Sequence, residues 1–213
     1  MRFETLPKHW QRVFALEWES LCEGSKAIAA VIADDAGNIL SEGRNQTAES
    51  VVPNPATAHA ETEAIRNLDT GQYPDKWAYT LYAGLEPCIM CMGTLVMGGI
   101  RKVEIAARDA FGGAMHLIGC SDFARAKNIQ ITWLDNELGD MQRAFQTIRE
   151  LLYNEDAEKL ERMLRDFSVH NQCGVQAAQE LVASGWLANQ AMVPETAAAV
   201  FNALAERMEQ ISP

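Results

Sequence analysis

The chain has 213 residues, and 48% of them are hydrophobic, which suffices for one domain or for one domain with an appendage. Its formal net charge of −11 argues against a nucleic-acid partner, since no cluster of lysines and arginines offsets it. The sequence has neither an apolar run of bilayer length nor a signal-peptide core, so we expect a cytoplasmic protein without a membrane partner.

Helices and strands are expected to alternate through the first two thirds of the chain. Apolar residues three and four apart, together with proline and glycine at the ends, predict helices over residues 7–23, 59–68, 87–97 and 121–127. Apolar runs of strand length predict strands over residues 27–33, 39–42, 77–85, 102–107 and 129–134. The first two strands form a hairpin, and residues 45–57 form a loop. This alternation predicts an α/β fold with a mixed sheet between layers of helices.

The pattern changes at Gly139. From there to the C-terminus, apolar residues recur only at helical spacing, which predicts an all-helical segment. We therefore divide the chain into a domain of residues 1–138 and a helical extension of residues 139–213. The extension could close a site, form a subunit interface or pad the fold, and its sequence leaves these alternatives open.

The cysteines point to a metal. There are five, an odd number, and only Cys88 and Cys91 form a Cys-x-x-Cys pair, which favours metal ligation and free thiols over a disulfide framework. Cysteines three apart in the first turn of a helix lie on one face, where the helix N-terminus favours the thiolate. With His59, they offer a tetrahedral zinc three ligands and leave one position open for water, as in catalytic sites. Glu61, two residues past the histidine, is free to move protons.

His-x-Glu at residues 59–61, joined to Pro-Cys-x-x-Cys at residues 87–91, is the signature of zinc nucleobase deaminases. Together with the segments 81–93 and 107–110, it makes the chain resemble the cytidine and deoxycytidylate deaminase superfamily over roughly residues 7–135. A histidine as first ligand is similar to the branch that holds tRNA adenosine, guanine, cytosine and deoxycytidylate deaminases. The resemblance implies a three-layer α/β/α, cytidine-deaminase-like fold, a bound Zn²⁺ ion and a homodimer.

By that resemblance, the zinc ligands are His59, Cys88 and Cys91, and Glu61 carries a proton from water to the ring nitrogen and then to the departing amine. The resemblance and the neighbouring positions also suggest substrate contacts by Asn45, the backbone N–H of Ala60, Glu86 and Asp109. Asn45 could instead be a turn residue, and Asp109 could instead cap the end of a strand.

We therefore expect a hydrolytic deaminase of a small heterocycle, such as a purine or another nucleobase or nucleoside. Two departures from the tRNA-editing branch argue against tRNA: the acidic helical tail, and Phe111-Gly112-Gly113 in place of a lysine-containing turn. The alternatives are an adenosine deaminase acting on tRNA and a non-catalytic zinc-binding interaction module.

Overall fold

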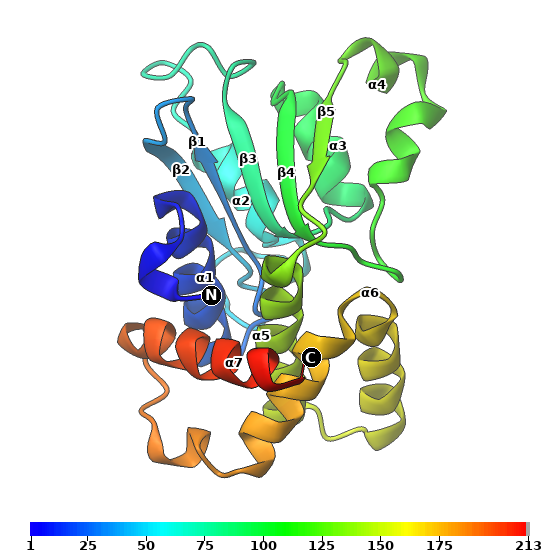
Figure 1. Cartoon of the computed structure of the whole chain (residues 1–213). Helices are drawn as coiled ribbons and strands as arrows, with labels where there is room; N and C mark the ends of the chain where they lie inside the picture. The colour runs from blue at the N-terminus through cyan, green and yellow to red at the C-terminus, as the bar shows by residue number, and fades with distance from the viewer. Residues whose placement is uncertain (212–213) are drawn as a thin grey trace.

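A mixed sheet forms the centre of the molecule in the computed structural model, which describes residues 1–211 (Figure 1). Its strands lie in the order β2-β1-β3-β4-β5. They are β1 (Ala29–Ala33), β2 (Ile39–Arg44), β3 (Thr80–Leu85), β4 (Lys102–Ala107) and β5 (Gln130–Trp133). β1 pairs antiparallel with both β2 and β3, whereas β3, β4 and β5 are parallel. The predicted α/β class, the mixed sheet and the hairpin are confirmed.

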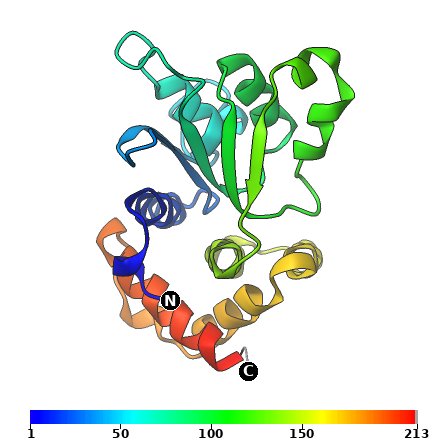
Figure 2. The ribbon, with the colours of Figure 1, turned by 45° about the horizontal axis from the view of Figure 1, so that its top comes forward.

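Helices cover both faces of the sheet. They are α1 (Lys8–Cys22), α2 (Ala60–Asn67), α3 (Ile89–Gly98), α4 (Asp122–Ala126), α5 (Glu137–Tyr153), α6 (Ala157–Ala183) and α7 (Ala197–Ile211). α2 and α3 lie on one face, and α1 and α5 lie side by side on the other, where Figure 2 shows them nearly end-on. α7 and the C-terminal half of α6 pack beneath α1 and α5 as a further layer.

The two cores follow from alternation along the strands. Every residue of β1 is buried, as expected of a strand covered on both faces. Val31 points into the core formed with α1, α5 and α7, while Ala30 and Ile32 point into the core formed with α2. Because side chains alternate with a period of two, a single apolar strand holds both helical layers in place.

α6 bends at Asn171, whose backbone is not helical (φ −135°, ψ 51°). Three residues later the helix approaches α5 so closely that a Cβ on Gly174 would lie 1.9 Å from the carbonyl oxygen of Asp140. The bend and this contact place the first half of α6 beside the end of the sheet (Figures 1 and 2).

The third strand starts later than the sequence predicts. Residues 76–78 form a turn in which the Ala78 amide donates to the Asp75 carbonyl at 2.8 Å, and Tyr79 lies between this turn and the strand. Trp77 is 57% exposed. The prediction placed the start of the strand too early because aromatic residues, which favour strands, also occur in the segment before it. Among residues 1–211, no helix combines the length and the apolar character needed to cross a bilayer.

Candidate metal centre and adjoining cavity

The fold brings the starts of two helices together. His59 is the residue before α2, Cys88 is the residue before α3, and Cys91 lies in the first turn of α3. Both helices pack on the same face of the sheet and touch each other. Gly43 on β2 permits the close approach of α2, since a Cβ there would lie 2.2 Å from the Ala60 carbonyl oxygen.

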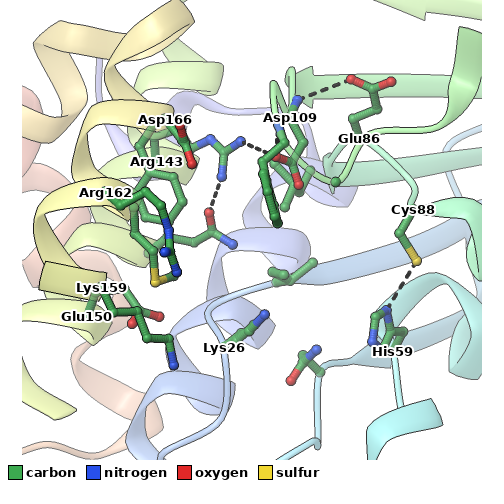
Figure 3. Close-up of a pocket in the computed structure, with 18 of the residues that line it drawn as sticks. Lys26, His59, Glu86, Cys88, Asp109, Arg143, Glu150, Lys159, Arg162 and Asp166 are labelled. Atoms are coloured by element: carbon green, nitrogen blue, oxygen red, sulfur yellow. Dashed lines mark hydrogen bonds and ion pairs between the residues drawn. The ribbon is translucent and has the colours of Figure 1, made fainter. Parts of the chain in front are cut away.

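The three predicted ligand atoms form a compact triangle. Cys88 Sγ lies 3.5 Å from His59 Nδ1 and 3.6 Å from Cys91 Sγ, and Cys91 Sγ lies 3.6 Å from His59 Nδ1 (Figure 3). Tetrahedral zinc, with Zn–S of about 2.3 Å and Zn–N of about 2.0–2.1 Å, requires S···S of about 3.8 Å and S···N of about 3.6 Å. The triangle therefore fits one face of a zinc tetrahedron, and no fourth His, Cys, Asp or Glu joins it among residues 1–211.

Electrostatics at the triangle favour a thiolate on Cys88. Hydrogen bonds with the side chains of Cys91 and His59 lower the pKa of Cys88 to about 3. The same contact with Cys88 raises the pKa of the Cys91 thiol, and the Cys88 sulfur raises the pKa of the His59 imidazole. Both cysteines are free thiols rather than a disulfide, so their sulfurs are available to a metal.

Glu61 sits beside the triangle. Its side chain is only 4% exposed, yet it lines the adjoining cavity together with His59 and Cys88. Burial raises the pKa of its carboxyl. A carboxyl with a raised pKa can both accept and return a proton near neutral pH, which is the property that a proton shuttle requires.

The cavity next to the triangle has a volume of about 350 Å³, which lies in the range of small-molecule sites. Three of the four predicted substrate-contact residues, Asn45, Glu86 and Asp109, line it. Ala60 is fully buried at the start of α2 and is not among the lining residues.

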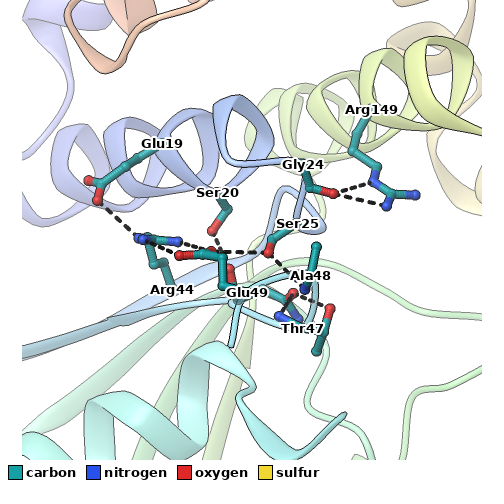
Figure 4. A network of polar contacts seen from close by, with 10 residues as sticks. Glu19, Ser20, Gly24, Ser25, Arg44, Thr47, Ala48, Glu49 and Arg149 are labelled. Atoms are coloured by element: carbon teal, nitrogen blue, oxygen red, sulfur yellow. Dashed lines mark hydrogen bonds and ion pairs between the residues drawn. The ribbon is translucent and has the colours of Figure 1, made fainter. Parts of the chain in front are cut away.

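Asn45 is a turn residue that also lines the cavity. Its Oδ1 accepts hydrogen bonds from the Thr47 amide and hydroxyl, as in a turn, while its Nδ2 has no partner within residues 1–211. The loop that carries it is fixed to α1 by the Ser20 hydroxyl, which donates to the Asn45 carbonyl, and by the pairing of Arg44 with Glu19 and Glu49 (Figure 4). Asn45 therefore offers a rigidly held donor at the cavity wall.

Glu86 and Asp109 organise the opposite wall. The Glu86 carboxylate accepts the backbone amides of Asp109 at 3.1 Å and Met115 at 3.2 Å. Asp109 Oδ1 accepts the Phe111 amide and pairs with Arg143 at 3.3 Å (Figure 3). Asp109 thus caps its own turn and also faces the cavity.

The extension supplies a wall of the cavity that the sequence did not predict. The lining residues from α5 and α6 are Arg143, Gln146, Glu150, Lys159, Arg162, Met163, Asp166 and Phe167. Arg143 lies outside the apolar stripe that Met141, Ala144, Phe145 and Ile148 form on α5, so the sequence carried no signal of its burial.

Arg143 is 2% exposed and holds several partners in place. It donates to the Arg108 carbonyl at 2.8 Å and to Gln146 Oε1, and its guanidinium lies 4.6 Å from the centre of the Phe167 ring. Since arginine only donates hydrogen bonds, the Gln146 oxygen must face it, which leaves the Gln146 NH₂ for other partners.

Comparison with known proteins agrees with this geometry. A family model of the cytidine and deoxycytidylate deaminase zinc-binding region matches residues 4–107. The tRNA-specific adenosine deaminase of Haemophilus influenzae is 35% identical over 126 residues, which cover 56% of this chain and 70% of that one. The probable cytosine deaminase of Schizosaccharomyces pombe is 35% identical over 81 residues, covering 38% of this chain and 47% of that one.

The fold is shared with solved structures as well. A protein in complex with 2,6-diaminopurine has a TM-score of 0.53 and 21% identity, over 70% of this chain and 82% of that one. The triangle, Glu61 and Asn45 all lie within the segment that the family model matches, whereas α5, α6 and α7 lie outside it. The chain belongs to the cytidine and deoxycytidylate deaminase family.

Proposed function

We propose that the protein is a zinc-dependent hydrolytic deaminase of a small nucleobase, nucleoside or related heterocycle. Water supplies the oxygen that replaces an exocyclic amine, and the amine leaves as ammonia. The observation that carries this proposal is the placement of the buried Glu61 carboxyl beside the His59, Cys88 and Cys91 triangle, at the end of one cavity.

In this proposal, His59 Nδ1 and the two sulfurs hold a zinc ion, which when bound supplies Lewis-acid activation of water. Glu61 takes the proton that water gives up, passes it to the adjacent ring nitrogen and delivers a proton to the departing amine. General acid–base groups of this kind contribute about 10²–10⁴-fold to a rate.

The remaining wall groups suit a polar, planar ring. Asn45 Nδ2 and the Gln146 NH₂ can donate hydrogen bonds, whereas the carboxylates of Glu86 and Asp109 accept them. Ring nitrogens and carbonyl oxygens accept hydrogen bonds and exocyclic amines donate them, so a heterocycle can match both kinds of group. The Ala60 amide stays a predicted contact.

The test is an ammonia-release screen of the zinc-loaded protein over bases, nucleosides, pterins and triazines, with zinc measured on the same sample. We expect one zinc per chain and ammonia from a small heterocycle. One zinc per chain without ammonia from any compound would instead favour the non-catalytic zinc module.

An adenosine in tRNA is the second candidate substrate, because the Haemophilus influenzae relative is named a tRNA-specific adenosine deaminase. The net charge of −11 weighs against it, since binding to phosphates depends on lysine and arginine. An electrophoretic shift of tRNA at low salt tests this candidate. We expect no shift, and a shift that disappears as salt is added would favour tRNA.

We further propose a homodimer. The apolar helix α3 leaves Ile89 66% exposed and Met97 72% exposed, as expected of a face that packs on another subunit. Size-exclusion chromatography with light scattering tests this. A monomeric mass at micromolar concentration would contradict the homodimer. The cytoplasmic location stays a prediction from the sequence.

A further inference from the structure

Besides the buried Arg143, three cations line the cavity: Lys26, Lys159 and Arg162. Lys26 precedes β1, and Lys159 and Arg162 lie on the first half of α6. Lys159 and Arg162 are three residues apart and share one face of that helix. Figure 3 shows Lys159 and Arg162 across the cavity from His59 and Cys88, with Lys26 between Lys159 and His59.

These cations have no partner of their own. Within residues 1–211, the side chains of Lys26, Lys159 and Arg162 form no ion pair, hydrogen bond or cation–π contact. Lys8 and Lys76 are the other lysine or arginine residues of that segment without such a contact. The remaining basic side chains are engaged, for example Arg149 with Glu150 at 3.0 Å.

The acids on the same side do not cancel this charge. Glu150 pairs with Arg149 and also accepts from Asn154 at 3.2 Å. Asp109 pairs with the buried Arg143. Asp166 is the remaining acid on this wall, and its charge also acts on Arg143. Asp166 is therefore the one acid without an ion pair on the α6 side of the cavity, whereas Glu61 and Glu86, which also line the cavity and form no ion pair within residues 1–211, lie on the side of the metal triangle.

We infer that the substrate carries an anionic group, a phosphate or a carboxylate, which Lys26, Lys159 and Arg162 bind while the ring reaches the metal triangle. This inference rests on the proposed deaminase function. Cations that converge on a partly enclosed cavity concentrate an anionic ligand, and charge-assisted hydrogen bonds then hold it. The helical extension would thereby select the substrate.

The experiment measures binding by calorimetry and therefore does not depend on turnover. The probes are pairs that differ in one anionic group: uridine and uridine 5′-monophosphate, inosine and inosine 5′-monophosphate, lumazine and 6-carboxylumazine. The proteins, all zinc-loaded, are the wild type, the double variant K159Q/R162Q and the control R165Q. Arg165 lies on the same helix, pairs with Glu161 and does not line the cavity.

We expect the anionic member of at least one pair to bind at least about tenfold more tightly to the wild type and to R165Q. K159Q/R162Q should lose that preference and keep its affinity for the neutral member. The phosphate and carboxylate pairs tell the two anions apart. Equal affinity within every pair, or a preference that survives in K159Q/R162Q, would overturn the inference. The ammonia screen tests the deaminase function separately.

Discussion

Cys88 occupies a position where two local effects favour a thiolate. It precedes the first turn of α3, where backbone N–H groups point outward, and hydrogen bonds between its sulfur and the side chains of Cys91 and His59 lower its pKa. A thiolate is the form that zinc binds. The metal site thus depends on the placement of one sulfur at a helix N-terminus.

Replacement of Cys88 by serine tests this dependence. A hydroxyl is a far weaker zinc ligand than a thiolate, so we expect zinc content after dialysis to fall from one per chain to below about one tenth, with loss of any ammonia release. The control is Cys120→Ser, because Cys120 is exposed and lies outside the triangle. Full zinc retention by Cys88→Ser would contradict the ligand assignment.

Glu17 is a second unusual residue, because it is fully buried and its two carboxyl oxygens have no hydrogen-bond partner within residues 1–211. It packs against Gly84 of β3, where a Cβ would lie 1.8 Å from Glu17 Oε1. Burial raises the pKa of this carboxyl well above its ordinary value, although the nearby backbone N–H of Ala29 and, to a smaller extent, the charge of Arg143 act in the opposite direction.

A raised carboxyl pKa in the folded state gives a definite pH dependence. Above the ordinary glutamate pKa of about 4.3, the unfolded chain has released a proton that the folded chain still holds. The free energy of unfolding should therefore fall by about 1.4 kcal/mol per pH unit as pH rises toward the folded-state pKa of Glu17. Glu17→Gln removes this dependence.

We expect urea unfolding of zinc-loaded protein to show the difference. Between about pH 5 and about pH 7, the stability of Glu17→Gln relative to the wild type should rise by about 1 kcal/mol or more. Replacing the carboxyl by an amide can change the free energy of unfolding by an amount that does not depend on pH, and this amount cancels when the two pH values are compared. A relative stability that stays level across this range would mean that Glu17 is ionised in the folded protein.

At the scale of elements, the contact between β2 and α2 fixes the metal centre. A Cβ at Gly43 would meet the Ala60 carbonyl oxygen at 2.2 Å and the Ala64 amide nitrogen at 2.4 Å, both of them backbone atoms. A methyl group there must push α2 away from the sheet, and α2 begins directly after His59 and contains Glu61.

Gly43→Ala should therefore cost about 1–3 kcal/mol in the free energy of unfolding and weaken zinc binding. Gly93→Ala on α3 is the matched control, since a Cβ there meets nothing within 4 Å and alanine favours a helix. Urea unfolding and zinc titration of both variants provide the measurement. A Gly43→Ala protein as stable and as tightly zinc-binding as Gly93→Ala would contradict this role of the contact.

Several elements and the metal triangle could be predicted from the sequence. Local patterns specified the helix over residues 7–23, the hairpin and the strand over residues 102–107, because each depends on neighbours along the chain. The spacing of cysteines at a helix start, together with a histidine before another helix, was enough to predict the triangle.

The cavity wall that carries Lys159 and Arg162 could not be predicted in this way. The position of Lys159 and Arg162 opposite His59 depends on the bend at Asn171 and on the contact of Gly174 with Asp140, more than thirty residues apart. Neither feature has a local signature in the apolar pattern. The predicted start of β3 was wrong because a turn precedes the strand, although the residues of that turn include an aromatic residue that favours strands.

At the scale of the whole molecule, the extension is part of the sheet's covering layer. α5 packs on β3 and β4, and its apolar residues Met141, Phe145 and Ile148 share one core with Phe14 and Trp18 of α1. The division of the chain at residue 139 stays a proposal. It could separate parts with different functions, but α5 and α7 complete the hydrophobic core of the preceding residues.

Truncation after residue 138 should consequently leave an unfolded or aggregated chain. Loss of these helices would expose the apolar side chains of α1 that are buried against α5 and α7. Each Å² of apolar surface exposed to water costs about 25 cal/mol of stability. Circular dichroism and size-exclusion chromatography of the truncated chain, with zinc present, test this. A monodisperse chain that melts cooperatively would show that residues 1–138 fold alone.

The central claim is that a buried carboxyl moves protons beside a metal held by three protein ligands. The most direct test compares Glu61→Gln with the control Glu63→Gln, whose carboxylate pairs with Arg66 on the same helix. Ammonia release and zinc content are measured on both, with the best substrate from the screen. We predict that Glu61→Gln keeps one zinc per chain and loses about 10²–10⁴-fold in rate, while Glu63→Gln stays near the wild type. A Glu61→Gln protein that retains zinc and more than about one hundredth of the wild-type rate would contradict the claim.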